Sequence, residues 1–214
     1  MNILTNMALG AMAPLKPYPA QGNALAVLVL PPPRLSGGLP LMQALAGRQS
    51  QREFSLQALH AQMLSDLPWS ACGINRKQLG GSTAPSAMNA QEVDLYVALP
   101  EGLYLYEPEP HQLRLTLHSD VRSATGYQDF VDRAALDLVF VADHRRMMLV
   151  PASQRSAYAA AGAMAQNVYL FCASECLSTV IRAWIDREAL GKAMGLDPDE
   201  QVLLAQTAGY AAPA

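Results

Sequence analysis

Leu-Asp-Leu-Val-Phe-Val-Ala, residues 136–142, is a nearly continuous apolar run. A strand that is covered on both faces has this pattern, so the run predicts the central strand of a sheet. Short runs rich in apolar and β-branched residues predict further strands at Val93–Leu99, Leu103–Tyr106 and Gln112–Leu117, and the first two form a hairpin around a Pro-Glu-Gly turn. A last strand is predicted over Gln201–Ala205.

Two helices and a loop are predicted before these strands. Pro40 opens a short helix over Leu41–Gly47, because a proline in the first turn lacks only an N–H that has no helical partner. A second helix is predicted to begin at Ser55 as its N-cap and to end at Pro68. Residues 75–89 are polar and rich in glycine, which favours a loop.

Two helices are also predicted after residue 150. Ser153 is the expected N-cap of a long helix that runs to about Leu177 and is rich in small residues. Arg187–Met194 is predicted to be a shorter helix that ends at Gly195. Helices and strands do not alternate regularly, so the fold class is α+β.

The composition predicts a globular chain with an interface. Hydrophobic residues make up 51% of the 214 residues and charged residues 15%, against about 25% in typical domains. The apolar content excludes a disordered chain, and the scarcity of charge indicates that some apolar surface lies between subunits. A net charge of −3 without a basic excess argues against nucleic acid as a partner.

Cysteine and histidine usage does not predict a disulfide framework or a metal site. The three cysteines, Cys72, Cys172 and Cys176, contain no Cys-x-x-Cys pair. Cys172 and Cys176 are four residues apart in the predicted long helix, so they are expected to share one face as small hydrophobic residues. The four histidines match no metal-binding spacing.

The N-terminal region is predicted to be an extended arm. Residues 1–38 are rich in proline and glycine, set among apolar residues, and could lie on a partner subunit. The apolar run Ala24–Leu30 is too short to cross a bilayer, so no membrane partner is expected. Ala-Met-Ala at residues 11–13 is similar to a signal-peptide cleavage site, but no Lys or Arg precedes it. We therefore expect a cytoplasmic protein, with a periplasmic one as the alternative.

One polar segment could bind an anion. In an extended chain, Arg48, Ser50 and Arg52 project to the same side, while Glu53 points away. Two guanidinium groups and a hydroxyl suit phosphate oxygens. Taken alone, the segment fits a solvated connection between helices at least as well.

A second segment could bind a flat polar ring. Residues 82–91 combine short hydroxyl and amide side chains with Pro85, and they can present donors and acceptors to a heterocycle. Taken alone, they also fit an ordinary turn-rich loop. No glycine-rich phosphate loop and no Gly-x-Ser-x-Gly motif is present in the sequence.

Together and in order, these segments resemble the FMN-dependent nitroreductase family, especially its compact bacterial members. The resemblance extends from about Leu39 to Tyr210. The matching segments are Arg48-x-Ser50-x-Arg52-x-Phe54, Trp69–Arg76, Thr83-Ala84-Pro85-Ser86-Ala87-x-Asn89-x-Gln91, Gln166–Leu170 and Gln206–Tyr210.

The resemblance implies a homodimer with a central, mostly antiparallel sheet, in which residues 39–214 form the FMN-binding domain. Arg48, Ser50 and Arg52 would hold the flavin phosphate and ring edge, and the Pro85 loop would reach the flavin from the other subunit. A turn at residues 181–184 would offer a backbone N–H near flavin N5. The predicted cofactor contacts are Arg48, Gln49, Ser50, Arg52, Pro85, Ser86, Ala87, Asn89, Gln128, Arg182, Ala183 and Trp184.

The resemblance further implies an enzyme that takes hydride from NAD(P)H and reduces a nitroaromatic, a quinone or a similar small acceptor by a ping-pong mechanism. Because the flavin carries the chemistry, no catalytic side chain is predicted. A specialised flavin-dependent oxidase of a small molecule or peptide heterocycle is one alternative. A flavin-free binding or structural homodimer is another, favoured by Cys176, Ser178 and Ala183 at positions where the family commonly has glycine.

Overall fold

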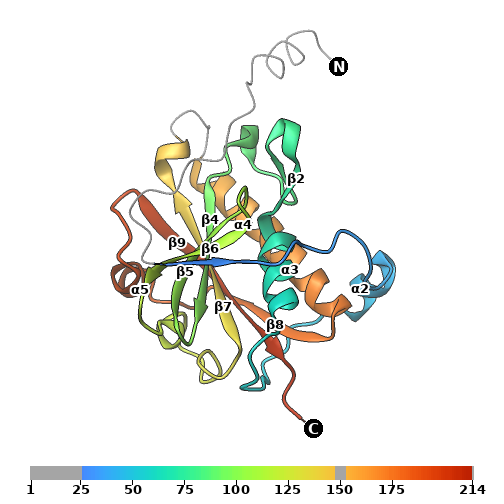
Figure 1. Ribbon diagram of the computed structural model, residues 1–214. Helices are drawn as coiled ribbons and strands as arrows, with labels where there is room; N and C mark the ends of the chain where they lie inside the picture. The colour runs from blue at the N-terminus through green and yellow to red at the C-terminus, as the bar shows by residue number, and fades with distance from the viewer. Residues whose placement is uncertain (1–25, 148–152, 214) are drawn as a thin grey trace.

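A single antiparallel sheet organises the molecule. The structure, a computed structural model, describes residues 26–147 and 153–213. Seven strands pair in the order β1-β6-β5-β4-β7-β9-β8, and every pairing is antiparallel (Figure 1). The α+β prediction is therefore confirmed. The strands are β1 (Val27–Val29), β4 (Val93–Leu99), β5 (Gly102–Glu107), β6 (Gln112–Leu117), β7 (Leu136–Asp143), β8 (Leu177–Arg182) and β9 (Glu200–Tyr210).

The apolar run at residues 136–142 forms the central part of the sheet, as its sequence predicts. All eight residues of β7 are buried, and the strand pairs with β4 on one side and β9 on the other. Its side chains alternate between two apolar clusters. Leu136, Leu138 and Phe140 pack on one face, while Val139 and Val141 pack on the other.

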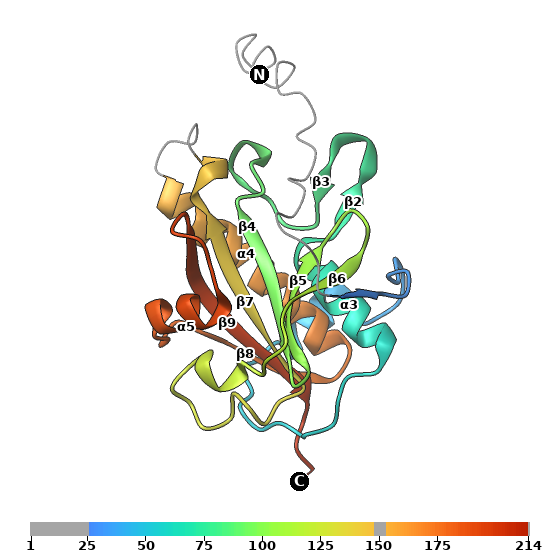
Figure 2. The same cartoon turned by 60° about the vertical axis from the view of Figure 1, so that its left-hand side comes forward.

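Helices cover both faces of the sheet. On one face lie α3 (Ala61–Cys72) and α4 (Ser153–Ser174), with α2 (Leu41–Gly47) packed against α4 (Figure 1). On the other face lies α5 (Arg187–Met194), which ends at Gly195 in the left-handed conformation (Figure 2). Both short helices have the predicted bounds. The predicted capping side chain of the long helix, that of Ser153, lies outside the described residues.

The second helix differs from its prediction at both ends. It begins at Ala61, because His60 rather than Ser55 is the N-cap and its Nδ1 accepts a hydrogen bond from the Met63 N–H at 3.3 Å. The backbone N–H of Ser55 instead donates to Tyr210 O, which holds this segment beside the end of β9. Pro68 lies inside the helix, since losing one backbone hydrogen bond does not outweigh the packing of its buried face.

Residues 75–89 are more ordered than the predicted loop. They contain most of a small hairpin, in which β2 (Ile74–Arg76) pairs with β3 (Gly81–Ser82). Gly80 adopts a left-handed conformation with φ of 61° between the two strands. A glycine at this position makes the tight reversal possible, and composition alone did not separate this hairpin from an irregular loop.

The region after the long helix also differs from its prediction. α4 ends at Ser174 rather than near Leu177, so Cys172 and Cys176 do not share a helix face: Cys172 is buried, whereas Cys176 is exposed. The predicted turn at residues 181–184 is strand β8 up to Arg182. Strand β9 is longer than predicted, because residues 206–210 pair with β8.

The segment before α2 lies on this chain's own sheet and helices where it is described. Strand β1 pairs with β6 at the edge of the sheet. Arg34 forms ion pairs with Asp66 on α3, at 2.5 Å, and with Glu175 after α4, at 3.0 Å. The predicted arm over residues 1–25 lies outside the described residues. Among the described helices, none has the length and apolar character that crossing a bilayer requires.

Candidate functional site

The predicted anion-binding segment lies beside strand β8. The Gln51 N–H donates to Thr179 O at 3.0 Å, which ties the segment to the strand. Gln49, Ser50 and Arg52 are exposed. Within the described part of the chain, the Arg52 side chain makes no hydrogen bond or ion pair, so its guanidinium is available to a ligand.

Tyr169 on α4 connects this segment to β8. Its hydroxyl lies 2.7 Å from Ser50 Oγ and accepts a hydrogen bond from the Ile181 N–H at 3.0 Å. The guanidinium carbon of Arg48 lies 5.1 Å from the centre of the Tyr169 ring, within the range of a cation–π contact. One buried tyrosine therefore fixes Ser50, Arg48 and the end of β8 relative to one another.

The hydrogen bonding of Tyr169 affects what Ser50 can bind. Because the phenol oxygen accepts from Ile181, its own proton can be donated to Ser50 Oγ. In that arrangement the Ser50 hydroxyl hydrogen is free to be donated to a ligand oxygen. Sequence reasoning did not select Tyr169, although it lies in the matching segment Gln166–Leu170, since a tyrosine at a core-facing helix position usually serves packing.

The second predicted segment is a tight loop before β4. Pro85 is exposed, Ser86 and Asn89 are half-buried, and Ala87–Asn89 form a 3-10 turn. Ser86 Oγ accepts a hydrogen bond from the Gln91 N–H at 3.0 Å. This hydrogen bond joins the two ends of the loop.

Within one chain, the two segments contact different sides of α4. Asn167 Nδ2 donates to Thr83 O at the start of the Pro85 loop, whereas Tyr169 contacts Ser50. Two residues along an α-helix correspond to a rotation of about 200°, so these contacts leave the helix in nearly opposite directions. A single copy therefore does not bring the Arg48 segment and the Pro85 loop together through α4.

The remaining predicted contacts gather at the end of β8. Gly126 lies against Arg182 and Gln128, since a Cβ at this glycine would meet both side chains. Gln128 Oε1 is buried and has no hydrogen-bond partner in residues 26–147 and 153–213. Next to them, the side chains of Tyr127 and Trp184 are exposed, and the centres of their rings lie 5.4 Å apart.

The Arg182 side chain points into the protein. Its guanidinium pairs with Asp137 at 2.5 Å and donates to Thr125 O and Oγ1. Asp137 also accepts from Thr207 Oγ1 on β9. Burial raises the pKa of Asp137, although the nearby Arg182 charge and the hydrogen bonds act in the opposite direction. The pair thus fixes the end of β8. The Arg182 guanidinium is buried, and its Nε has no hydrogen-bond partner in the described residues.

The structure therefore forms one contiguous region from residues 48–52, 126–128 and 179–184. The Pro85 loop lies apart from it in a single chain. Among the described residues, no group of three or more His, Cys, Asp or Glu side chains is arranged to hold a metal ion.

Comparisons with known proteins identify the family of the chain. A model of the nitroreductase family matches residues 45–210. The chain is similar to a protein from Ralstonia eutropha JMP134 whose structure was assigned to the nitroreductases, with 50% identity and a TM-score of 0.85 over 94% of this chain and 96% of that chain. No curated protein matches the chain significantly.

More distant structures share the fold. A chain of the E. coli microcin synthetase McbBCD complex has 17% identity and a TM-score of 0.68, over 86% of this chain and 78% of that chain. The NADPH:FMN oxidoreductase from Vibrio harveyi has 18% identity and a TM-score of 0.60, over 81% and 69%. The family model and the relative at 50% identity show that the chain belongs to the nitroreductase family.

Proposed function

We propose that this oxidoreductase of the nitroreductase family binds FMN, accepts hydride from NAD(P)H and reduces a small acceptor such as a nitroaromatic or a quinone. The observation that carries the proposal is the junction of Ser50, Tyr169 and Ile181. This junction joins a segment suited to phosphate to a strand end that offers backbone N–H groups. Family membership and the FMN oxidoreductase from Vibrio harveyi support the same cofactor.

The donor set at this junction fits FMN. A phosphate needs cationic and hydroxyl donors, which Arg48, Ser50 and Arg52 supply. A flavin ring also carries an N–H donor, and the buried Gln128 Oε1 is an acceptor without a partner in the described residues. The side chain of Ser178 is buried on β8, so it does not occupy the exposed side of this region.

Each residue has a role that follows from its position. Arg48 and Arg52 would neutralise the phosphate and the ring edge, and Tyr169 would orient the Ser50 hydroxyl toward a phosphate oxygen. The backbone N–H groups of Ala183 and Trp184 would stabilise electron density near flavin N5. The chemistry that FMN supplies when bound is acceptance of hydride from NAD(P)H and delivery of electrons to the acceptor, which gives a ping-pong order.

The proposed assembly is a homodimer with a flavin site at each end of its interface. The Arg48 segment and the Pro85 loop contact nearly opposite sides of α4. Two copies related by a twofold axis can place the loop of one subunit against the Arg48 segment of the other. Pro85, Ser86, Ala87 and Asn89 would then complete the pocket from the partner.

A flavin titration tests the cofactor. Arg48→Ala should weaken FMN binding by about tenfold or more, since a charge-assisted hydrogen bond contributes about 1.5–3 kcal/mol. Arg155→Ala, on the exposed first turn of α4, is the matched control and should bind FMN like the unchanged protein. Equal affinity of the Arg48 variant would rule out this phosphate site.

Anaerobic reduction tests the donor. Flavin-loaded protein mixed with NADH or NADPH should lose its yellow absorbance, and steady-state rates with a quinone or nitroaromatic should give parallel double-reciprocal lines. If neither nicotinamide bleaches the loaded protein, a specialised oxidase replaces this proposal. If the purified protein is colourless and binds no FMN, the flavin-free homodimer replaces it.

A further inference from the structure

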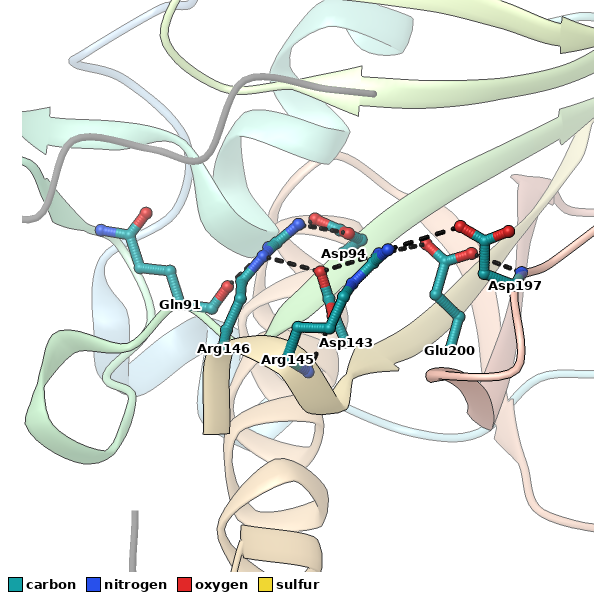
Figure 3. A network of polar contacts seen from close by, with 7 residues as sticks. All are labelled: Gln91, Asp94, Asp143, Arg145, Arg146, Asp197 and Glu200. Atoms are coloured by element: carbon teal, nitrogen blue, oxygen red, sulfur yellow. Dashed lines mark hydrogen bonds and ion pairs between the residues drawn. The ribbon is translucent and has the colours of Figure 1, made fainter. Parts of the chain in front are cut away.

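A network of ion pairs joins the ends of three strands next to the Pro85 loop. Asp94 lies at the start of β4, Asp143 at the end of β7 and Glu200 at the start of β9. Arg145 and Arg146 belong to the 3-10 turn His144–Met147 that follows β7. Figure 3 shows the two arginines extending to opposite sides of Asp143.

Arg146 connects the sheet to the loop. Its Nη1 and Nη2 atoms form a fork on the Asp94 carboxylate, at 2.9 and 2.7 Å, and its Nε lies 3.2 Å from Asp143 Oδ2. Nη1 also donates to the backbone oxygen of Gln91 at 2.9 Å (Figure 3). The Arg146 side chain is only 16% exposed, so it is held from three directions.

Gln91 is the residue through which the loop is held. Its N–H bonds to Ser86 Oγ at 3.0 Å, and its side-chain amide donates to Gly80 O at 2.5 Å and to Asn89 Oδ1 at 3.3 Å. The contact with Arg146 adds the backbone oxygen. Gln91 therefore links both ends of the loop to the hairpin before it and to the sheet behind it.

The loop needs such support because its backbone is strained. Met88, Asn89 and Gln91 have φ of 54°, 55° and 48°, in the left-handed region that residues other than glycine rarely adopt. Strained conformations persist only where surrounding contacts fix them, and they are typical of sites that bind ligands. Without an anchor at Gln91, these residues would relax to negative φ and move the Asn89 and Ser86 side chains.

We propose that Arg146 is a positioning residue: it fixes the Gln91 carbonyl and thereby keeps the Pro85–Asn89 loop in the conformation that receives the partner's flavin. This inference rests on the proposed function, which assigns the loop to the cofactor pocket. The two carboxylates behind Arg146 set the direction of its guanidinium, and only a planar fork can serve Asp94 and the Gln91 oxygen together.

The neighbouring arginine provides a matched control. Arg145 bonds to the same Asp143 at 2.8 Å. Its other ion pairs are with Asp197, which precedes β9, and with Glu200, the first residue of β9. None of the contacts that the structure gives for Arg145 reaches the Pro85 loop. Removing either arginine deletes one positive charge beside Asp143, but of the two only Arg146 contacts Asp94 and the Gln91 oxygen.

The experiment compares Arg146→Met, Arg146→Lys and Arg145→Met in the full chain. Hydrogen exchange of the amides at residues 86–91 is measured without added FMN, and the FMN dissociation constant is measured by titration. Both Arg146 variants should exchange these amides at least tenfold faster and bind FMN at least fivefold more weakly. Arg145→Met should stay within twofold of the unchanged protein in both measurements. Arg146→Lys keeps the charge, which makes a folded variant available if the Met variant unfolds.

Each result has a defined meaning. Unchanged exchange in both Arg146 variants, or equal acceleration in Arg145→Met, overturns the anchor. Faster exchange with unchanged FMN affinity overturns the role in cofactor binding. If the unchanged protein binds no FMN, the proposed function and the cofactor role fail together, while faster exchange only in the Arg146 variants still supports the anchor.

Discussion

The hydroxyl of Tyr169 serves two segments that are far apart in the sequence. It accepts from the Ile181 N–H and lies within hydrogen-bond distance of Ser50 Oγ. A phenylalanine at this position would keep the ring under Arg48 but leave the Ile181 N–H without that acceptor. A buried donor that loses its partner costs about 1–3 kcal/mol.

Tyr169→Phe should therefore lower the free energy of unfolding by about 1–3 kcal/mol and also weaken FMN binding by about threefold to tenfold. The second effect follows because the Ser50 hydroxyl loses its orientation. Urea unfolding and flavin titration measure the two quantities. Tyr158 is on the same helix, and its hydroxyl makes no hydrogen bond within the described residues. Tyr158→Phe should therefore change neither the free energy of unfolding nor the FMN affinity.

Glu92 is a buried carboxyl whose ionisation costs stability. Its side chain is fully buried, and neither carboxylate oxygen has a hydrogen-bond partner in the described residues. Burial raises its pKa, against smaller opposing contributions from its own backbone N–H and from Arg146. Because the pKa of Glu92 is higher in the folded state than in the unfolded state, folding is not penalised below the unfolded pKa of about 4.3. The free energy of unfolding then falls as pH rises from there through the folded pKa.

Glu92→Gln should remove this pH dependence, because the amide does not ionise. The free energy of unfolding of the variant, relative to the unchanged protein, should rise with pH above about 4.3 and level off above the folded pKa of Glu92. Urea unfolding at several pH values between 4 and 8 measures the difference. A constant difference across this range would contradict an ionisation cost at Glu92.

The end of helix α4 is strained at one residue. Cys176 is exposed and has φ of 57°, between the last turn of the helix and β8. A glycine here would adopt this conformation without a clash at Cβ. The left-handed residue reverses the chain between Ser174 and β8, so the helix ends before the predicted Leu177.

Cys176→Gly should raise the free energy of unfolding by about 0.5–1 kcal/mol, since the left-handed strain of about 1–2 kcal/mol exceeds the entropy cost of a glycine. Cys176→Ala keeps a Cβ and should not reproduce the gain. Thermal unfolding would show a rise of about 1–4 °C for glycine alone. An equal rise for alanine would attribute the effect to the thiol instead.

The elements differ in how well local sequence predicts them. The apolar pattern was sufficient to predict β4 and β7, because a strand that is buried on one or both faces has apolar residues at the buried positions. Ser55 was misleading, since its N–H bonds to Tyr210, which is 155 positions away in the sequence. The Arg48 and Pro85 segments were found through their motif order, whereas Tyr169 and Arg146 depend on contacts that no local pattern encodes.

At the scale of the whole molecule, apolar side chains remain exposed around α2. Leu41, Met42 and Leu45 on the helix are 63%, 74% and 43% exposed, and Leu56 in the segment after it is 81% exposed. Exposed apolar groups at this density are typical of subunit interfaces. Together with the low charge of the chain, they favour a second copy as the partner of this surface.

We expect a homodimer in solution at micromolar concentration. Met42→Glu would place a charge in the apolar surface and should shift the protein toward the monomer by at least tenfold in dissociation constant. Light scattering across a dilution series measures this, with Val29→Glu on the edge strand β1 as the control, since Val29 is 73% exposed and Met42 is 74% exposed. A stable monomer of the unchanged chain would contradict the dimer.

The position of β9 has a consequence for how the chain folds. Strand β9 comes last in the sequence, yet in the sheet it lies between β7 and β8. In the described sheet, β8 pairs with β9 alone. During synthesis, β7, α4 and β8 leave the ribosome with the place between the two strands still open. Pairings between distant strands close slowly, and unpaired edges aggregate. The nascent chain should therefore leave one edge of β7 and the whole of β8 unpaired until residues 200–210 have emerged.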